Sequence, residues 1–186
     1  MAKTATLLWV DLEMTGLEPG KDKIMEVAAV ATGWDLEPTA EFTATVKVDP
    51  EIVKERMVGK FWDENPESYK ALVSKNDEGK SAEEVEKDLL NWITKNFAES
   101  AIPGESKYKG KIILAGNSIH QDRKFIDIEW PELSKKLHYR MLDVSAWKLY
   151  FEGAKHLRYT KREDHRALAD IKGSIGELKW YLTFLK

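Results

Sequence analysis

Two carboxylates at the end of one apolar segment constrain this chain more than any other feature of its sequence. Residues 7–10 read Leu-Leu-Trp-Val, a run typical of a buried strand, and Asp11 and Glu13 follow directly. Because successive strand residues point to opposite faces, Asp11 and Glu13 point to the same face. Two like charges in poorly solvated surroundings repel each other, and a divalent cation bound by their oxygens removes that repulsion. The pattern therefore predicts a metal site at the end of this strand.

Composition narrows the class of protein and the class of partner. The 186 residues are 42% hydrophobic and 33% charged, so we expect one soluble domain over residues 1–186 with a sizeable core. The sequence has no apolar run of about 18 residues and no signal peptide, which predicts no membrane span and favours the cytoplasm. The cysteine count of 0 excludes disulfides and thiolate catalysis. A net charge of -3 implies that a nucleic-acid substrate is short, or is held locally at a metal centre.

The order of strand and helix patterns predicts an α/β domain with a mixed sheet. A second apolar run covers residues 24–31, and residues 41–48 alternate between apolar and polar side chains as a half-exposed strand does. Three strands with short links suggest an antiparallel meander. Two more short strands are expected at 111–115 and 139–144, and these alternate with helices.

Helical patterns fill the rest of the chain. Residues 50–80 hold broken helical patterns, and Ser81 with Glu84 forms a capping box that begins a helix. Further helical segments begin at Gln121, Pro131 and Ser145. Apolar residues repeat at 3,4,3,4,3 spacing from Leu168 to Leu185, which predicts a long amphipathic helix at the end of the chain.

Three more polar residues could complete the site at the strand end. Asp122 lies at the start of a helix, where the helix dipole alone would favour an aspartate. Asp170 lies beside the apolar stripe of the last helix, where a carboxylate is usually solvated. His165 precedes Asp170 by five residues, about 140° around a helix, so the two can meet only if His165 lies at or before the helix start. Asp164 is a candidate N-cap at that point. Each residue alone is weak evidence, and the spaced set is much stronger.

The five polar residues together resemble the signature of the DEDDh-type 3′→5′ exonucleases. Within that group the chain resembles the oligoribonuclease family. Residues 9–17 match the family's first motif, residues 116–123 the second and residues 165–171 the third. Residues 138–145 match a stretch typical of oligoribonucleases rather than of DEDDh enzymes at large. The resemblance implies an RNase H-like mixed five-stranded sheet flanked by helices, in agreement with the order of elements above.

This resemblance also implies a reaction. The family removes 5′-nucleoside monophosphates from the 3′ ends of very short RNAs, dinucleotides especially. Two divalent cations, Mg²⁺ or Mn²⁺, would bind the scissile phosphate, lower the pKa of a water and stabilise the leaving 3′ oxygen. By residue-by-residue carry-over the metal ligands would be Asp11, Glu13, Asp122 and Asp170. His165 would be the general base, a role that suits an imidazole pKa of about 6.5.

Substrate-contacting positions of the family have counterparts here as well. Leu17 matches a position that wedges against the bases. Ser118, Arg140 and Ser145 match contacts to the 5′ phosphate, which favour short single-stranded RNA, and the planar donor fork of arginine suits that group. Tyr139 matches a tyrosine that reaches the active site of a neighbouring subunit, which implies a homodimer.

The match is less regular around the aromatic residue that stacks on a base. Trp62 corresponds to it, but an apparent insertion leaves Phe61 as the alternative. A histidine that the family often places shortly afterwards is not evident near Glu67. Ala146 and Trp147 stand where bacterial relatives commonly carry a small hydroxyl residue. These departures concern the binding of the 5′ phosphate rather than catalysis.

Two alternatives remain open at this point. One is a 3′→5′ DNA exonuclease of proofreading type, against which the motif around Arg140 argues. The other is an inactive nucleotide-binding module, against which the complete five-residue signature argues. Two further carboxylates are expected to be structural: Glu26 as a buried group with a hydrogen-bond partner, and Asp143 as a hydrogen-bonding group at a strand end.

Overall fold

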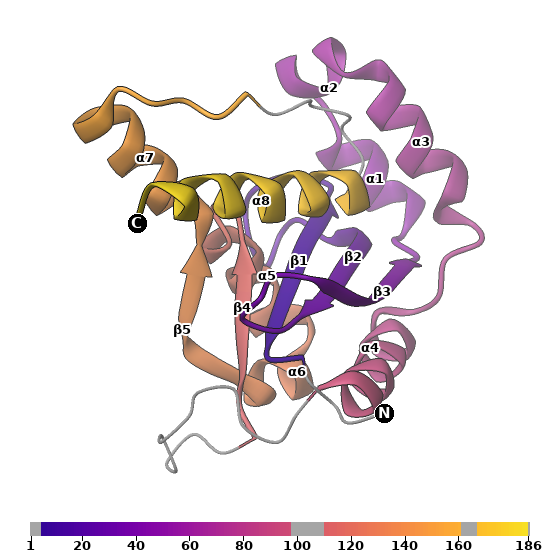
Figure 1. Ribbon diagram of the computed structural model, residues 1–186. Helices are drawn as coiled ribbons and strands as arrows, with labels where there is room; N and C mark the ends of the chain where they lie inside the picture. Colours follow the sequence, from indigo (N-terminus) through magenta and orange to yellow (C-terminus); the bar gives the residue numbers. More distant parts are fainter. Residues whose placement is uncertain (1–4, 98–109, 161–166, 186) are drawn as a thin grey trace.

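Five strands form the mixed sheet that the sequence predicts, in the order β3-β2-β1-β4-β5 (Figure 1). The computed structural model describes residues 5–97, 110–160 and 167–185. The antiparallel meander consists of β1 (Leu7–Met14), β2 (Ile24–Thr32) and β3 (Pro38–Thr45). On the other side of β1, β4 (Ile112–Gly116) and β5 (Leu137–Asp143) continue the sheet with parallel pairing. The strand with the two carboxylates is therefore the central one.

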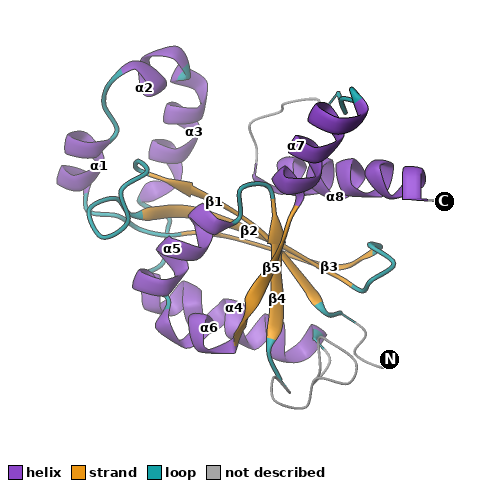
Figure 2. Ribbon diagram, turned by 90° about the vertical axis from the view of Figure 1, so that its left-hand side faces the viewer, coloured by secondary structure: helices purple, strands orange, loops and turns teal. Residues whose placement is uncertain are grey.

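Side chains of β1 alternate between two faces, and each face has its own layer of helices. Leu8, Val10 and Leu12 belong to one hydrophobic cluster, which is closed by α4 (Ala82–Asn96), α5 (His120–Glu129) and α6 (Pro131–Lys136). Leu7 and Trp9 belong to a second cluster, which is closed by α7 (Val144–Lys155) and α8 (Ala167–Leu182). Figure 2 shows the two layers on opposite sides of the sheet. By the same alternation, the residues at positions 11 and 13 face α8.

A third hydrophobic cluster lies under three short helices: α1 (Pro50–Arg56), α2 (Lys60–Glu64) and α3 (Pro66–Asn76). The cluster joins residues of these helices, among them Val53, Trp62 and Leu72, to Met25 of β2. Asn76 ties the end of α3 to the chain after β3, because its side chain accepts from the Val48 amide at 2.9 Å and donates to the Val48 carbonyl at 2.8 Å. The broken helical pattern predicted for residues 50–80 thus corresponds to three short helices, α1, α2 and α3.

Helix starts follow their sequence signals more closely than helix ends do. The predicted capping box of α4 is present, with reciprocal hydrogen bonds between Ser81 and Glu84 at 3.2 and 3.0 Å. The apolar stripe of α8 is buried at Ile171, Ile175 and Leu178. Leu185, the last member of the stripe, lies in a short 3₁₀ turn (Thr183–Leu185) and is 61% exposed. The apolar repeat therefore outruns the part of the helix that packs on the sheet.

The third and fifth strands are shifted furthest from their predicted bounds. The third was expected at 41–48 and is found at Pro38–Thr45, because its pairing with β2 runs from Thr32–Pro38 to Glu26–Thr45. The fifth was expected at 139–144 and is found at Leu137–Asp143, because Asp143 is the N-cap of α7 and residue 144 is already helical. Within the described parts of the chain, no helix is long and apolar enough to cross a membrane.

Candidate active site

The ends of β1 and β4 bring the first predicted ligands together. The pairing of β4 with β1 ends at Trp9 and Ala115, and beyond that point the Leu12 amide donates to Asp122 Oδ1 at 3.0 Å. Gly116 keeps the two strands close, because a Cβ atom there would lie 3.0 Å from the Val10 carbonyl oxygen. Asp122 is buried in the first turn of α5. Its carboxylate therefore lies against the strand that carries the paired acidic residues.

The charges of three of the predicted carboxylates act on the fourth, Glu13. The pKa of Glu13 is raised to about 8, first by burial and then by the charges of Asp11, Glu26, Asp170 and Asp122 in that order of size. Burial likewise raises the pKa of Asp122 to about 7, with a contribution from Asp11 and an opposing hydrogen bond from the Leu12 amide. The structure thus brings residues from β1, α5 and α8 into one acidic centre.

The donor chemistry of this acidic centre fits a divalent cation. It offers carboxylate oxygens, which hard cations prefer, and it holds Glu13 where burial and neighbouring carboxylates disfavour the ionised form. Across residues 5–97, 110–160 and 167–185, no three acidic or histidine side chains are close enough as placed to hold an ion. His165, the predicted general base, lies outside these described residues. The fit therefore rests on donor type and electrostatics.

A cavity of about 670 Å³ opens beside the acidic centre, between β3, α3 and α8. Its lining includes Glu13, Glu26, Lys75 and Ala167. Lys75 Nζ donates to Glu26 Oε2 at 3.1 Å, which is the hydrogen-bond partner expected for this partly buried carboxylate. The volume lies in the range of about 300–1,000 Å³ that is usual for small-molecule sites. A ligand bound in this cavity would contact the acidic centre directly.

A second polar cluster, the serine cluster, consists of Ser118, Asp143 and Ser145 and joins the turn after β4 to the start of α7. Ser118 has φ +48°, a left-handed conformation that is uncommon outside glycine. Its amide donates to Asp143 Oδ1 at 3.1 Å and to Ser145 Oγ at 2.8 Å, and the two serine hydroxyl oxygens are 3.1 Å apart. Asp143 also accepts from the Ser145 amide at 2.9 Å, so it has the expected hydrogen-bonding role. The structure thus places both predicted serines side by side.

Sequence reasoning missed a residue that links this serine cluster to α8. Asn117 Nδ2 donates to Ser174 Oγ at 2.7 Å, and Ser174 Oγ donates to the Asp170 carbonyl at 2.9 Å. The side chain of Asn117 also accepts from Ser145 Oγ at 3.3 Å. The only sign of this role in the sequence was that Asn117 is a polar residue in a Gly-Asn-Ser turn. Its hydrogen-bond partners, Ser145 and Ser174, lie far along the chain.

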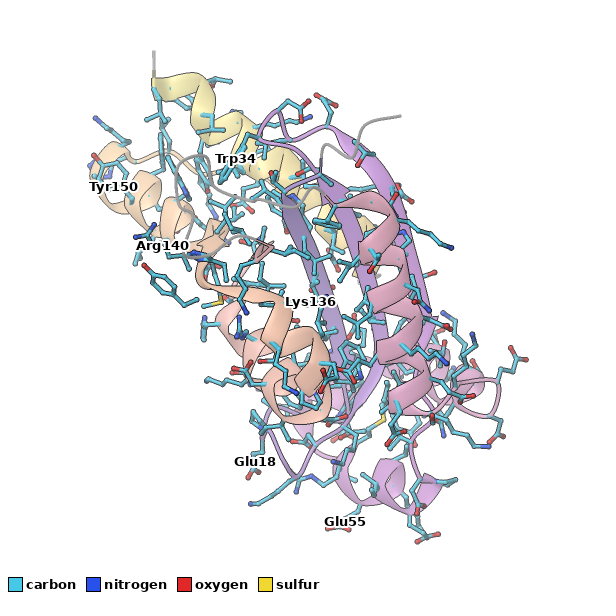
Figure 3. All side chains as sticks on the ribbon, turned by 90° about the horizontal axis from the view of Figure 1, so that it is seen from below. Glu18, Trp34, Glu55, Lys136, Arg140 and Tyr150 are labelled. Carbon is cyan, nitrogen blue, oxygen red and sulfur yellow. The ribbon has the colours of Figure 1, made fainter. Side chains whose placement is uncertain are left out.

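The remaining predicted substrate residues are largely at the surface. Leu17 is 71% exposed, and Gln121 Nε2 holds its carbonyl oxygen at 2.9 Å. Tyr139 and Arg140 are exposed on β5, with the guanidinium carbon of Arg140 lying 5.2 Å from the centre of the Tyr139 ring. In Figure 3, Arg140 lies between Lys136 of α6 and Tyr150 of α7.

The two candidate stacking aromatics differ sharply in exposure. Trp62 is 8% exposed and packs edge-on against the ring of Tyr69 at 6.1 Å. Phe61 is 63% exposed. A base can stack only on an accessible ring face, so the arrangement favours Phe61, the alternative that the sequence left open.

Comparisons with known proteins find relatives over almost the whole chain. The exonuclease family RNase_T matches residues 8–178. A probable oligoribonuclease of Schizosaccharomyces pombe is 37% identical over 185 residues, which cover 96% of this chain and 68% of that protein. An oligoribonuclease of Chromobacterium violaceum is 37% identical over 191 residues, which cover 98% and 97%.

Solved structures agree at the level of the fold. Exonuclease I of Methylocaldum szegediense superposes with a TM-score of 0.61 at 14% identity, covering 98% of this chain. The present chain spans 41% of the length of that exonuclease. This likeness confirms the predicted RNase H-like fold with its mixed sheet between helices, and at this identity it carries nothing beyond the fold.

Proposed function

The chain belongs to the oligoribonuclease family of exonucleases, and from that premise we propose that it degrades short single-stranded RNA from the 3′ end. The products would be 5′-nucleoside monophosphates, and dinucleotides would be the preferred substrates. One observation carries the proposal: the Leu12 amide holds Asp122 of α5 against β1 at 3.0 Å, where burial and the surrounding carboxylates raise the pKa of Glu13. Such convergence of acidic groups is typical of a centre that performs metal-assisted hydrolysis.

Four carboxylates would hold two divalent cations, Mg²⁺ or Mn²⁺: Asp11, Glu13, Asp122 and Asp170. The cations would supply positive charge at the scissile phosphate and to the attacking water. Asp122 is fixed for this task, because the Leu12 amide holds one of its oxygens at 3.0 Å. His165 would accept the proton of the attacking water at an imidazole nitrogen. The water oxygen would bond to phosphorus as the bond to the 3′ oxygen of the preceding nucleotide breaks.

The serine cluster would bind the 5′ phosphate of the substrate and so limit its length. Ser118 and Ser145 hold their hydroxyl groups 3.1 Å apart, and Arg140 would add a charged donor fork. Leu17 would wedge against the bases, and the exposed ring of Phe61 would stack on one of them in place of the buried Trp62. A substrate with both ends held in this way can span only a few nucleotides.

We also propose that the chain acts as a homodimer, in the cytoplasm, with residues 1–186 as one exonuclease domain. Tyr139 of one protomer would reach the active site of its partner, and its 59% exposure leaves the side chain accessible for that contact. Analytical ultracentrifugation combined with an activity assay at the same concentration tests this point. A fully active monomer would contradict it.

The test of the main proposal is a time course with a 5′-labelled RNA dinucleotide and a longer RNA of related sequence, with Mn²⁺ or with a chelator. We expect fast, metal-dependent loss of the dinucleotide and slower attack on the longer RNA. Preference for the longer strand, or for DNA, would instead assign the chain to the general exonucleases. Cleavage of neither, with retained dinucleotide binding, would point to a binding module.

The 5′-phosphate contact has its own test. Arg140→Ala should weaken binding of a 5′-phosphorylated dinucleotide about tenfold more than binding of the unphosphorylated form, because one charge-assisted contact is lost. Lys136→Ala, which removes an exposed cation just before the same strand, is the matched control and should change neither. An equal effect of Arg140→Ala on both ligands would remove Arg140 from the phosphate site.

A further inference from the structure

The turn that carries Leu17 is built around one buried carboxylate, Asp22, which is 1% exposed. Its Oδ1 accepts from the Thr15 hydroxyl at 3.1 Å, and its Oδ2 accepts from the Glu18 amide at 2.8 Å. Thr15 in turn accepts from the Lys23 amide at 3.0 Å. The residues on both sides of Leu17 are therefore bonded to the same side chain.

The turn packs onto Asp22 so closely that it leaves no room for a side chain at Gly16. A Cβ atom at this position would lie 2.6 Å from Asp22 Oδ2, well inside contact distance. The backbone beside Leu17 is thus fixed by packing as well as by hydrogen bonds. An apolar side chain that is 71% exposed can act as a wedge only if its backbone is held in this way.

Arg56 completes this arrangement from a different part of the chain. It lies in the last turn of α1, and its Nε donates to Asp22 Oδ1 at 2.7 Å. Its Nη2 donates to Asp22 Oδ2 at 3.2 Å and to Glu18 Oε1 at 3.1 Å. Figure 3 shows Glu18 and Glu55, the neighbour of Arg56, at the same end of the molecule. Only a planar fork of donors makes these contacts at once, so a lysine could not replace the arginine.

A second tether holds the turn from the side of the acidic centre. Gln121 Nε2 donates to the Leu17 carbonyl at 2.9 Å, and Gln121 is adjacent in sequence to Asp122. The backbone of the turn around Leu17 is therefore held by hydrogen bonds at two places, at Asp22, which pairs with Arg56, and at the start of α5.

We propose that Arg56 is a positioning residue for substrate selection: it holds Asp22 and Glu18 so that Leu17 is presented, rigid and exposed, between the bases of a dinucleotide. This inference rests on the proposed function and assigns a role to a residue outside the acidic centre. Arg56 touches neither substrate nor metal in this scheme and acts only through Leu17.

The first test measures kcat and KM of Arg56→Met with two substrates. One is an RNA dinucleotide, and the other is the p-nitrophenyl ester of thymidine 5′-monophosphate, which has a single base and gives a wedge nothing to separate. We expect KM for the dinucleotide to rise about tenfold, the size associated with ordering one binding group, while kinetics with the ester stay within about twofold. Lys21→Met is the matched control, because the exposed ammonium group of Lys21 pairs with the carboxylate of Glu18 rather than with that of Asp22.

The double variant of Leu17→Ala with Arg56→Met decides whether Arg56 acts through Leu17. If it does, adding Arg56→Met to Leu17→Ala changes KM for the dinucleotide by less than about twofold, because the effects of two substitutions that remove the same interaction do not add. If the two effects multiply, or if the ester is impaired as much as the dinucleotide, Arg56 supports the fold in general and the proposal is wrong.

A measurement without substrate separates this proposal from the proposed function. The chain contains 0 cysteines, so Leu17→Cys creates a single site for a nitroxide spin label. The label should be immobilised in the otherwise unchanged protein and clearly more mobile when Arg56→Met is added, but not when Lys21→Met is added. Equal label mobility in all three proteins would overturn the role of Arg56, whatever substrate the enzyme prefers. If the labels behave as expected and the dinucleotide is not cleaved, it is the proposed substrate that fails.

Discussion

The acidic centre and the buried carboxylate of Asp22 lie on either side of the turn at residues 15–21, and their electrostatic surroundings are opposite. In the acidic centre, burial and, to a smaller extent, neighbouring carboxylates raise the pKa of Glu13 to about 8 and that of Asp122 to about 7. At Asp22 burial also acts to raise the pKa. There, hydrogen bonds from Arg56, the Glu18 amide and the Thr15 hydroxyl outweigh it and lower the pKa below its ordinary value.

The difference separates a structural carboxylate from a functional one. Asp22 has donors on both oxygens, so its charge is stabilised by the fold itself and fixes a turn. In the acidic centre, neighbouring carboxylates help to raise the pKa of Glu13 and of Asp122, so the folded chain keeps repulsion there that a bound cation would relieve. Natural proteins commonly give up stability in this way where a site must act chemically.

The largest expected effect comes from Asp122→Asn. We expect kcat to fall at least about a thousandfold, because metal ions at such centres supply several kcal/mol of transition-state stabilisation. In chelator the free energy of unfolding should stay unchanged or rise, because the repulsion between residues 11 and 122 is removed while the Leu12 amide keeps an oxygen acceptor. Single-turnover kinetics and urea unfolding, each with and without Mn²⁺, measure both quantities.

Asp127→Asn is the matched control for that experiment. It makes the same chemical change on the same helix, at an exposed residue that accepts from Arg123 and Ser134. Its kinetics should stay within about twofold of the unchanged enzyme, as for an ordinary surface substitution. An Asp122→Asn enzyme that is fully active, or that unfolds more easily in chelator than the control, would remove the contrast between the two carboxylate groups.

The next effect in size is on stability alone. Asp22→Asn should lower the free energy of unfolding by about 2 kcal/mol, because hydrogen bonds to a buried charged group are worth roughly 1.5–3 kcal/mol. Asp88→Asn, which alters a more exposed pair with Lys80, should change stability little. Urea unfolding in the presence of chelator compares the two variants. If Asp22→Asn is no more destabilising than Asp88→Asn, Asp22 does not hold the turn.

Local rules predicted one part of the acidic centre, and the family resemblance predicted the other. A strand period of two puts Asp11 and Glu13 on one face. Asp122 and Asp170 were expected there from the resemblance, because the helix dipole or solvation accounts for each of them alone. Residue type and spacing suffice for neighbours on one strand, but they do not bring residues of separate elements together.

Other features could not be predicted because they depend on distant partners. Arg56 and Asp22 are 34 residues apart and share no repeat or motif. Trp62 and Phe61 are adjacent aromatic residues, and only the packing of three short helices decides which of them is buried. The end of α8 depends on how far the sheet extends beneath it, which the apolar stripe of the helix does not encode.

The smallest expected effect is the pH dependence that Asp22 gives to stability. Its folded pKa is lowered, so between the folded pKa and the unfolded value of about 3.9 the unfolded state binds more protons. The contribution of Asp22 is therefore fully present above the unfolded pKa and is lost as the pH falls through the folded pKa. Urea unfolding at a series of acidic pH values should show the stability difference between the unchanged protein and Asp22→Asn shrinking toward low pH. The corresponding difference for Asp88→Asn should vary less. A difference for Asp22→Asn that stays constant down to the acid limit would mean that the Asp22 charge is not what its donors stabilise, and the contrast with the acidic centre would then rest on packing alone.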